Sequence, residues 1–195
     1  LDNGSASGPS GMGGNHLKVL AASEECLRGL AQMVQDLANG FLPEAAKRLV
    51  LASRLVALRK PNGGVRPIAV GEVIWKLTAI HLLQPCRQDL ASELQPTQMG
   101  VGVPGGIEKA VHGLTALIDD PQLGFAALTF DFTNAFNSVN RACVLQALFD
   151  QNPDELGRLW RATSWAYSDP SPLFISGEGN RVAHMLWSEE GVRQG

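Results

Sequence analysis

Apolar residues recur every three or four positions in several parts of the chain, a spacing typical of amphipathic helices. The clearest early case is 23–38, where Ser23 stands at the N-cap position and two glutamates follow it in the first turn. Further helices are predicted over 43–50, 72–83, 86–94, 107–118 and from 140 onward. Pro85 is expected to kink or split the helical stretch that contains it, because proline lacks the backbone N–H that an interior helical position uses.

Two pairs of apolar runs are separated by turns that contain glycine, which predicts two β-hairpins. Their strands are expected at 55–58 and 65–70, and at 171–176 and 181–187. Asn62-Gly63 favours a tight turn in the first hairpin, because both turn positions need positive φ. A further strand is predicted at 124–130, an apolar run of the kind that is buried on both faces of a sheet. Helices together with hairpins predict an α+β fold.

The apolar run at 124–130 ends at Asp131. A lone carboxylate at the end of a buried strand is costly unless it is paired or bound to a metal ion. Asn134, Ala135 and Phe136 follow before helical spacing resumes. Such an arrangement can hold a metal ion beside a flat substrate. The alternative interpretations are that Asp131 caps the following turn and that Phe136 is a core aromatic.

Residues 131–136 resemble the first carboxylate motif of the reverse transcriptase palm, Asp-x-x-x-Ala-Phe. Two further segments match in the same order. Residues 55–68 resemble the fingers hairpin that ends in Arg-Pro-Ile, and 191–195 resemble the start of a palm motif that normally continues Asp-Pro-Leu. Residues 98–106 are similar to the Gln-x-Gly-Phe segment of non-LTR retroelements, with valine in place of phenylalanine. The resemblance covers residues 55–195.

The resemblance implies an RNA-directed DNA polymerase, a nucleotidyltransferase that adds deoxynucleotides to the 3′-hydroxyl of a DNA primer on an RNA template. It implies a right-hand fold with helical fingers, a β-hairpin and a palm sheet. Asp131 would be catalytic and, with the backbone carbonyl of Phe132, would bind Mg²⁺, of which the complete enzyme uses two ions. The residues expected to bind the incoming deoxynucleoside triphosphate are Lys60, Arg66, Asn134, Ala135, Phe136 and Gln194. The ring of Phe136 would exclude a ribose 2′-hydroxyl by steric conflict.

The family's Tyr-x-Asp-Asp motif does not follow Trp187, so we expect the fingers and the first half of a palm. The expected organisation is a flexible lead-in rich in glycine and serine at 1–16, N-terminal helices at 17–54 and an incomplete polymerase-like part at 55–195. Such a fragment is expected to be inactive, to bind the two Mg²⁺ ions incompletely and to depend on the remaining palm and thumb. One alternative is a non-catalytic nucleic-acid-binding module derived from a retroelement. Another is an α/β domain with accidental motif matches.

Charge is unevenly distributed along the chain. The net charge is −3, yet residues 44–76 carry seven basic and two acidic side chains. A basic stripe beside an acidic remainder suits contacts with phosphates. The alternative is a solvated helix face followed by a charged hairpin.

Cys26, Cys86 and Cys143 lack the spacing of metal ligands or of a disulfide framework. They are expected to be buried thiols in a reducing, intracellular compartment, either nucleus or cytoplasm. No apolar run is long enough to span a membrane, so no membrane partner is expected.

Overall fold

A computed structural model describes residues 6–61, 63–120, 122, 124–150, 153–177 and 182–192 of the chain. The chain divides into two compact units. Unit 1 combines Leu1–Leu82 with Asn134–Gly195, and unit 2 is Leu83–Thr133. The fold is mixed α+β, as the sequence predicted.

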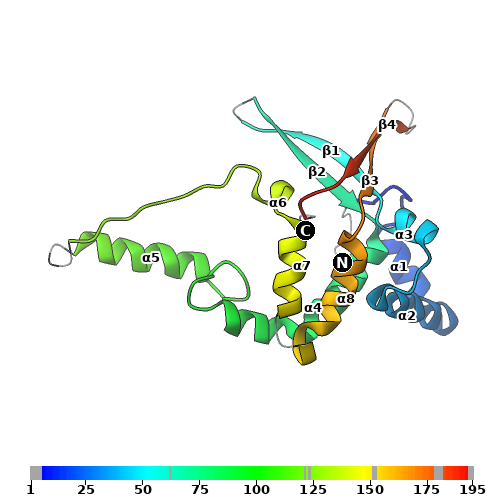
Figure 1. Ribbon diagram of the computed structural model, residues 1–195, viewed down its shortest axis with the longest axis horizontal. Coiled ribbons are helices and arrows are strands. Elements are labelled where there is room, and N and C mark those ends of the chain that lie inside the picture. The colour runs from blue at the N-terminus through cyan, green and yellow to red at the C-terminus, as the bar shows by residue number, and fades with distance from the viewer. Residues whose placement is uncertain are drawn as a thin grey trace. The chain divides into compact units, whose positions relative to one another are not determined.

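The sheet of unit 1 has the strand order β2-β1-β3-β4 (Figure 1). Its strands are β1 (Ser53–Arg59), β2 (Val65–Gly71), β3 (Ser171–Ser176) and β4 (Val182–Ser188). β1 pairs antiparallel with β2 and parallel with β3, and β3 pairs antiparallel with β4. Both predicted hairpins are therefore confirmed, and the parallel contact between β1 and β3 joins them into one sheet.

The helices of unit 1 are α1 (Gly14–Ala21), α2 (Glu24–Asn39), α3 (Glu44–Val50), the first part of α4 (Val73–Leu94), α6 (Ala135–Ser138), α7 (Arg141–Asp150) and α8 (Pro153–Tyr167). Four of them, α2, α3, α4 and α8, contribute to a small apolar core. The core contains Val34, Leu37, Val50 and Ile74, with Trp165 packed against it. No helix within the described ranges is both long enough and apolar enough to cross a membrane.

Part of the expected flexible lead-in contacts the end of β2. The backbone amide of Ser10 donates to the Glu72 carboxylate at 2.8 Å, and its hydroxyl donates to the other oxygen at 2.6 Å. Gly8 lies so close that an added Cβ would stand 2.7 Å from the carbonyl oxygen of Gly71. Residues 8–10 therefore have a defined place in unit 1, and α1 begins within the segment expected to be unstructured.

A buried lysine joins α3 to the loop after α8. The side chain of Lys47 is 8% exposed, and its ammonium donates to the carboxylate of Asp169 and, at 3.1 Å, to the hydroxyl of Ser168. It also lies 5.8 Å from the ring centre of Trp165. The hydrogen bonds from Lys47 and then Ser168 lower the pKa of Asp169 below its ordinary value. Asp169 therefore stabilises the fold as a carboxylate.

We expect Asp169→Asn to lower the free energy of unfolding at neutral pH by about 1–2 kcal/mol, because a buried ammonium loses the nearer of its two anionic partners and keeps only Glu44 at 3.9 Å. The pKa of Asp169 is depressed in the folded state, so this stabilisation is present at neutral pH and is lost as pH falls through the lowered pKa. Urea unfolding at several pH values should show the two proteins converging in acid. Glu24→Gln, which breaks an exposed pair with Arg28, is the matched control and should cost under about 0.5 kcal/mol. An equal cost for both substitutions would contradict the role of the buried ammonium.

Unit 2 contains the rest of α4, helix α5 (Gly106–Asp119) and an extended segment. Pro85 does not split the helix, because the 22-residue α4 continues through it, and the kink that was the other expectation stays a prediction. Proline removes one intrahelical hydrogen bond, and the bonds on either side still hold a helix of this length. The boundary between the two units falls between Leu82 and Leu83, just before this proline.

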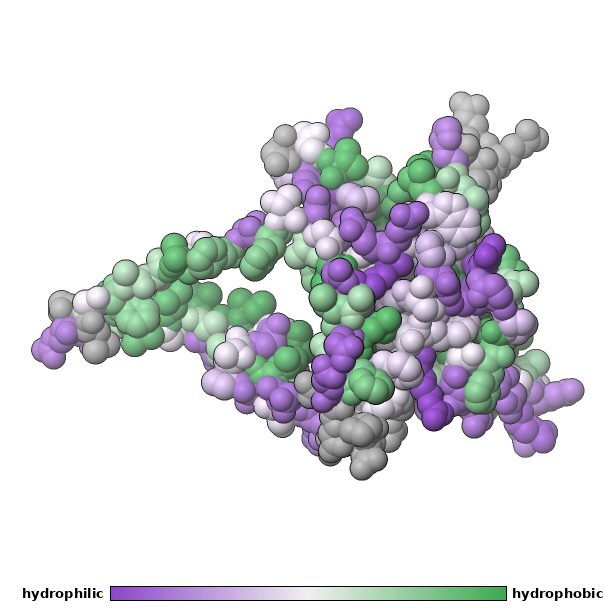
Figure 2. Space-filling view, viewed as in Figure 1, coloured by the Kyte–Doolittle hydropathy of each residue, from purple (hydrophilic) through white to green (hydrophobic). Residues whose placement is uncertain are grey.

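The predicted strand at 124–130 does not form. Residues 124–132 have no regular secondary structure, and Leu128, Phe130 and Phe132 are each 78% exposed. A strand must satisfy its backbone N–H and C=O groups through a neighbouring strand, and the four-stranded sheet described here does not include this segment. The apolar surface of α5 is also exposed, at Ile107, Val111 and elsewhere, and Figure 2 shows this part of the molecule as mostly green.

The prediction of three buried thiols is correct only for Cys86. Cys26 and Cys143 are exposed, and none of the three forms a disulfide. Cys26 lies in the first turns of α2 and Cys143 in the first turn of α7, on sides that do not pack into the core. The small apolar side chain of cysteine therefore did not by itself predict burial at these helical positions.

Candidate nucleotide-binding cleft

A cleft of about 290 Å³ lies in unit 1 between the sheet and the turn at α6. Its lining comes from the first hairpin, from β3, from the end of β4 and from the turn at α6. The residues are Leu55, Pro67, Ile68, Ala69, Asn137, Leu173, Trp187, Ser188, Glu189, Glu190 and Val192. The cleft is thus built by three of the segments singled out from the sequence, the first hairpin, the turn at α6 and the segment that begins at Gly191, together with β3 and the end of β4.

The turn at α6 presents Phe136 to solvent. Asn134 adopts the left-handed conformation, with φ of 54°, and is the N-cap of the one-turn helix. Asparagine tolerates this conformation better than most residues. Its carbonyl accepts from the amides of Asn137 at 2.9 Å and Ser138 at 3.1 Å. The turn leaves the ring of Phe136 57% exposed, so Phe136 is not a core aromatic within this structure.

The segment after β4 is hydrogen-bonded directly to this turn. The amide of Val192 donates to the carbonyl of Phe136 at 2.7 Å, and the amide of Gly191 donates to the carbonyl of Val139 at 3.0 Å. An alanine Cβ at position 191 would lie 2.4 Å from the carbonyl oxygen of Asn137, so the two backbones meet at a glycine. Two motifs more than fifty residues apart in the sequence are therefore adjacent in space. Gln194, in the same motif, lies outside the described residues.

The hairpin that lines the cleft carries three cations, Arg59, Lys60 and Arg66. In its register Leu58 pairs with Arg66 and Arg59 with Val65. Residues directly opposite each other share a face, and successive residues alternate. Arg59 therefore shares the face of three cleft-lining residues of the hairpin, Leu55, Pro67 and Ala69. Arg66 lies on the other face, with the fourth, Ile68.

Three of the seven basic side chains of the predicted stripe are engaged within the protein. Lys47 is buried beside Asp169, Arg48 pairs with Glu44 at 3.1 Å, and Arg54 donates to the carbonyl of Ser7 at 3.1 Å. The stripe is therefore reduced to the hairpin, where Arg59 and Arg66 are exposed and Lys60 is half-buried, together with exposed Lys76. The sequence showed the basic residues but not which of them form ion pairs or hydrogen bonds within the protein.

Asp131 and Phe132 belong to unit 2, where both are exposed in the extended segment. Across the described part of the chain, no group of three or more histidine, cysteine, aspartate or glutamate side chains could hold a metal ion. A pair of Mg²⁺ ions needs several oxygen ligands. Asp131 without further carboxylates does not provide them, so the described residues do not make a two-metal site.

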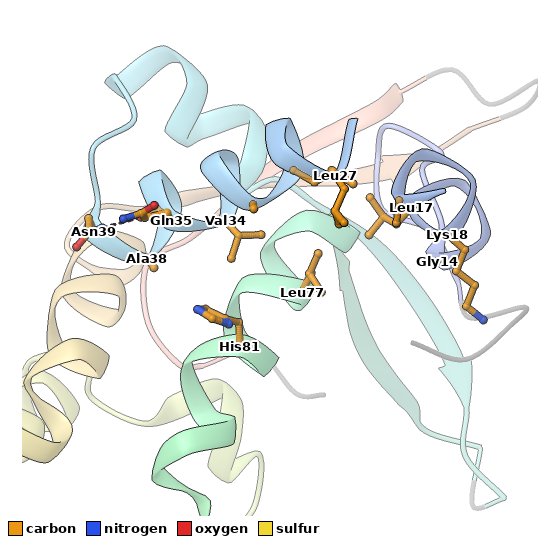
Figure 3. A pocket seen from close by; sticks show the side chains of 13 residues that line it. Gly14, Leu17, Lys18, Leu27, Val34, Gln35, Ala38, Asn39, Leu77 and His81 are labelled. Carbon is orange, nitrogen blue, oxygen red and sulfur yellow. Dashed lines mark hydrogen bonds between the residues drawn. The ribbon is translucent and has the colours of Figure 1, made fainter. Parts of the chain in front are cut away.

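A second and larger hollow of unit 1 lies between α1, α2 and α4, with a volume of about 790 Å³ (Figure 3). Figure 3 shows Leu17, Val34 and Leu77 around an apolar floor, with His81 on α4 at one side. Among the described residues, none of those predicted to bind nucleotide lines this hollow or the cleft, although Asn137, the neighbour of Phe136, lines the cleft. Both linings are largely apolar, and that of the cleft also includes the carboxylates of Glu189 and Glu190.

Sequence comparison supports a retroelement origin for this chain. It is 29% identical over 196 residues to the retrotransposable element SLACS 132 kDa protein of Trypanosoma brucei gambiense. The match covers 100% of this chain and 16% of that protein. The chain therefore spans about a sixth of the length of the relative that it matches. No protein-family model matches the chain.

Proposed function

We propose that this chain is the fingers and first palm portion of an RNA-directed DNA polymerase of retroelement type, and that its cleft receives a deoxynucleotide at the end of a primer–template. The docking of Gly191 and Val192 on the turn of Phe136 carries this proposal. It assembles two polymerase-like motifs at one cleft, and the polymerase-like hairpin forms a wall of the same cleft. The similarity to a retrotransposable element protein supports the same interpretation.

In this proposal each group has a separate task. Arg59 and Lys60 contact phosphates from the hairpin, and Arg66 binds the nucleic-acid backbone on the opposite face. Phe136 stands beside the sugar, where its ring leaves no space for a 2′-hydroxyl. Asp131 would contribute one oxygen ligand to a magnesium site whose other carboxylates come from elsewhere in the palm. DNA synthesis by the 195-residue chain alone is therefore not expected.

A non-catalytic nucleic-acid-binding module is the second candidate. The observation that favours it is that Asp131 belongs to no cluster of three or more potential metal ligands among the described residues. Such a module would use the hairpin cations and the cleft without chemistry. The two candidates agree on where nucleic acid binds and differ in whether the full protein extends a primer.

The test is binding of an RNA–DNA primer–template to the chain at several salt concentrations. We expect binding to weaken linearly on a log–log plot as salt rises, because each phosphate contact releases a counterion. Alanine at Arg59, Lys60 or Arg66 should each reduce the magnitude of that slope by about 1.

Arg28→Ala is the matched control, since the Arg28 side chain is 75% exposed on α2, away from the hairpin. Its slope should equal that of the wild-type chain. If Arg28→Ala weakens binding as much as the hairpin substitutions do, the attraction is a property of overall charge and not of the hairpin.

A further inference from the structure

One buried arginine at the start of α7 holds the segment that follows β4. Arg141 is 9% exposed, and all three of its guanidinium nitrogens donate hydrogen bonds to that segment. Nε donates to the carbonyl of Gly191 at 2.8 Å, and Nη1 donates to the carbonyl of Ser188 at 2.8 Å. Nη2 donates to the hydroxyl of Ser188 at 2.7 Å and to the carbonyl of Glu190 at 3.0 Å.

The guanidinium itself is fixed from its other side. Its central carbon lies 5.2 Å from the ring centre of Tyr167 at the end of α8. Burial lowers the pKa of Arg141, and the neighbouring Tyr167 and Glu190 oppose that shift, so the side chain stays cationic at neutral pH. A cation between an aromatic ring and three backbone carbonyls can take few other positions.

The bonds from Arg141 act on the same backbone that meets Phe136. Gly191 gives its carbonyl to Arg141 and its amide to Val139, and the next amide, that of Val192, binds the carbonyl of Phe136. The guanidinium, the segment 188–192 and the turn at α6 therefore form one connected hydrogen-bonded unit. If the guanidinium is removed, residues 188–191 lose their hydrogen bonds to Arg141, while the amides of Gly191 and Val192 can still bind the carbonyls of Val139 and Phe136.

We propose that Arg141 is a positioning residue that fixes residues 188–192 against the turn at α6 and thereby sets the orientation of Phe136, the neighbour of the cleft-lining Asn137. The further claim that Arg141 thereby affects selection of deoxynucleotides over ribonucleotides rests on the function proposed above. Arg141 touches no substrate in this account. It acts through Gly191, Val192 and the backbone of Phe136.

The local part of this inference is tested by amide hydrogen exchange in Arg141→Lys and Arg141→Gln. Lysine keeps the charge but cannot reproduce the fork of donors. We expect both variants to raise the exchange rates of the Gly191 and Val192 amides at least about tenfold, because the open state of the segment becomes more populated. Amides of α2 near Val34 and Leu37 should keep their wild-type rates. Unchanged rates at Gly191 and Val192 would overturn the inference, and so would an equal increase throughout α2, which would indicate a general loss of stability.

A second readout separates positioning from plain structural support. In the wild-type chain we measure the ratio of dissociation constants for ATP and dATP, and expect that ratio to fall at least about threefold in both Arg141 variants. The matched control is Arg28→Gln, which should leave both readouts unchanged. A wild-type ratio of one would contradict the proposed function, while the exchange rates still decide the role of Arg141. A preserved ratio together with locally faster exchange would overturn the link from Arg141 to Phe136.

Discussion

Alanine at Gly191 is expected to lower the free energy of unfolding by about 3–4 kcal/mol and to release the segment after β4 from the cleft. Gly191 has φ of 73°, a conformation that alanine adopts at a cost. The added Cβ would lie 2.4 Å, 2.6 Å and 2.7 Å from the carbonyl oxygen, carbonyl carbon and Cα of Asn137. All three are backbone atoms, so neither side can move away without breaking the hydrogen bonds to Phe136, Val139 and Arg141.

Gly11→Ala provides the control for backbone conformation alone. Gly11 has a similar φ of 76°, but nothing lies within 4 Å of an added Cβ. It should cost about 1 kcal/mol, as expected for alanine in the left-handed region. Urea unfolding of both variants checks the difference. If the two substitutions cost the same, the close approach of Gly191 to Asn137 does not contribute to stability, and the cleft is not held together as described.

Alanine at Phe136 is expected to remove most of the discrimination against ribonucleotides, with a change of about 10- to 100-fold in the ratio of dissociation constants for ATP and dATP. The ring is 57% exposed beside a turn whose backbone is fixed by Val192, so its loss opens space and leaves the surroundings intact. We expect the dissociation constant for ATP to fall, because the 2′-hydroxyl is no longer excluded, and the dissociation constant for dATP to stay the same. Equilibrium titrations of both nucleotides measure the two effects separately.

Phe41→Ala is the matched control for this experiment. Phe41 is 71% exposed in unit 1, after the end of α2, and is not part of the turn at α6. Its removal should change neither dissociation constant. A wild-type ratio that survives in Phe136→Ala would show that another group excludes the 2′-hydroxyl, and Phe136 would then have no role in selection.

Local sequence rules accounted for much of unit 1. The Asn62-Gly63 pair and the flanking apolar residues predicted the first hairpin, and periodicity with Ser23 and Gly40 predicted the limits of α2. These features depend on residues close together in the chain, so a single sequence contains the necessary information.

Features that depend on distant partners were not predictable in the same way. Arg141 contacts carbonyls 47 to 50 residues further along the chain, and no local pattern marks it as buried. The run at 124–130 has the composition of a buried strand, but strand formation requires a neighbour, and composition does not reveal whether one is present. Similarly, the basic stripe was visible in the sequence, whereas the burial of Lys47 against Asp169 was not.

The candidate site shows the same division. Sequence motifs identified the turn of Phe136, the hairpin and the segment that begins at Gly191, and the structure places these three around one cleft. The motifs did not single out Arg59, because the face on which a side chain lies depends on the strand register. They also gave no sign that Arg141 holds the segment in place.

The central claim is that nucleic acid occupies the cleft beside Phe136, and photo-cross-linking tests it most directly. A primer–template with iodouracil at the primer terminus is bound to the wild-type chain, irradiated and mapped by mass spectrometry. The account predicts cross-linked peptides from the hairpin at 55–69 and from the turn at 134–140. Cross-links confined to peptides of α1 and α2, around the larger hollow, would contradict it.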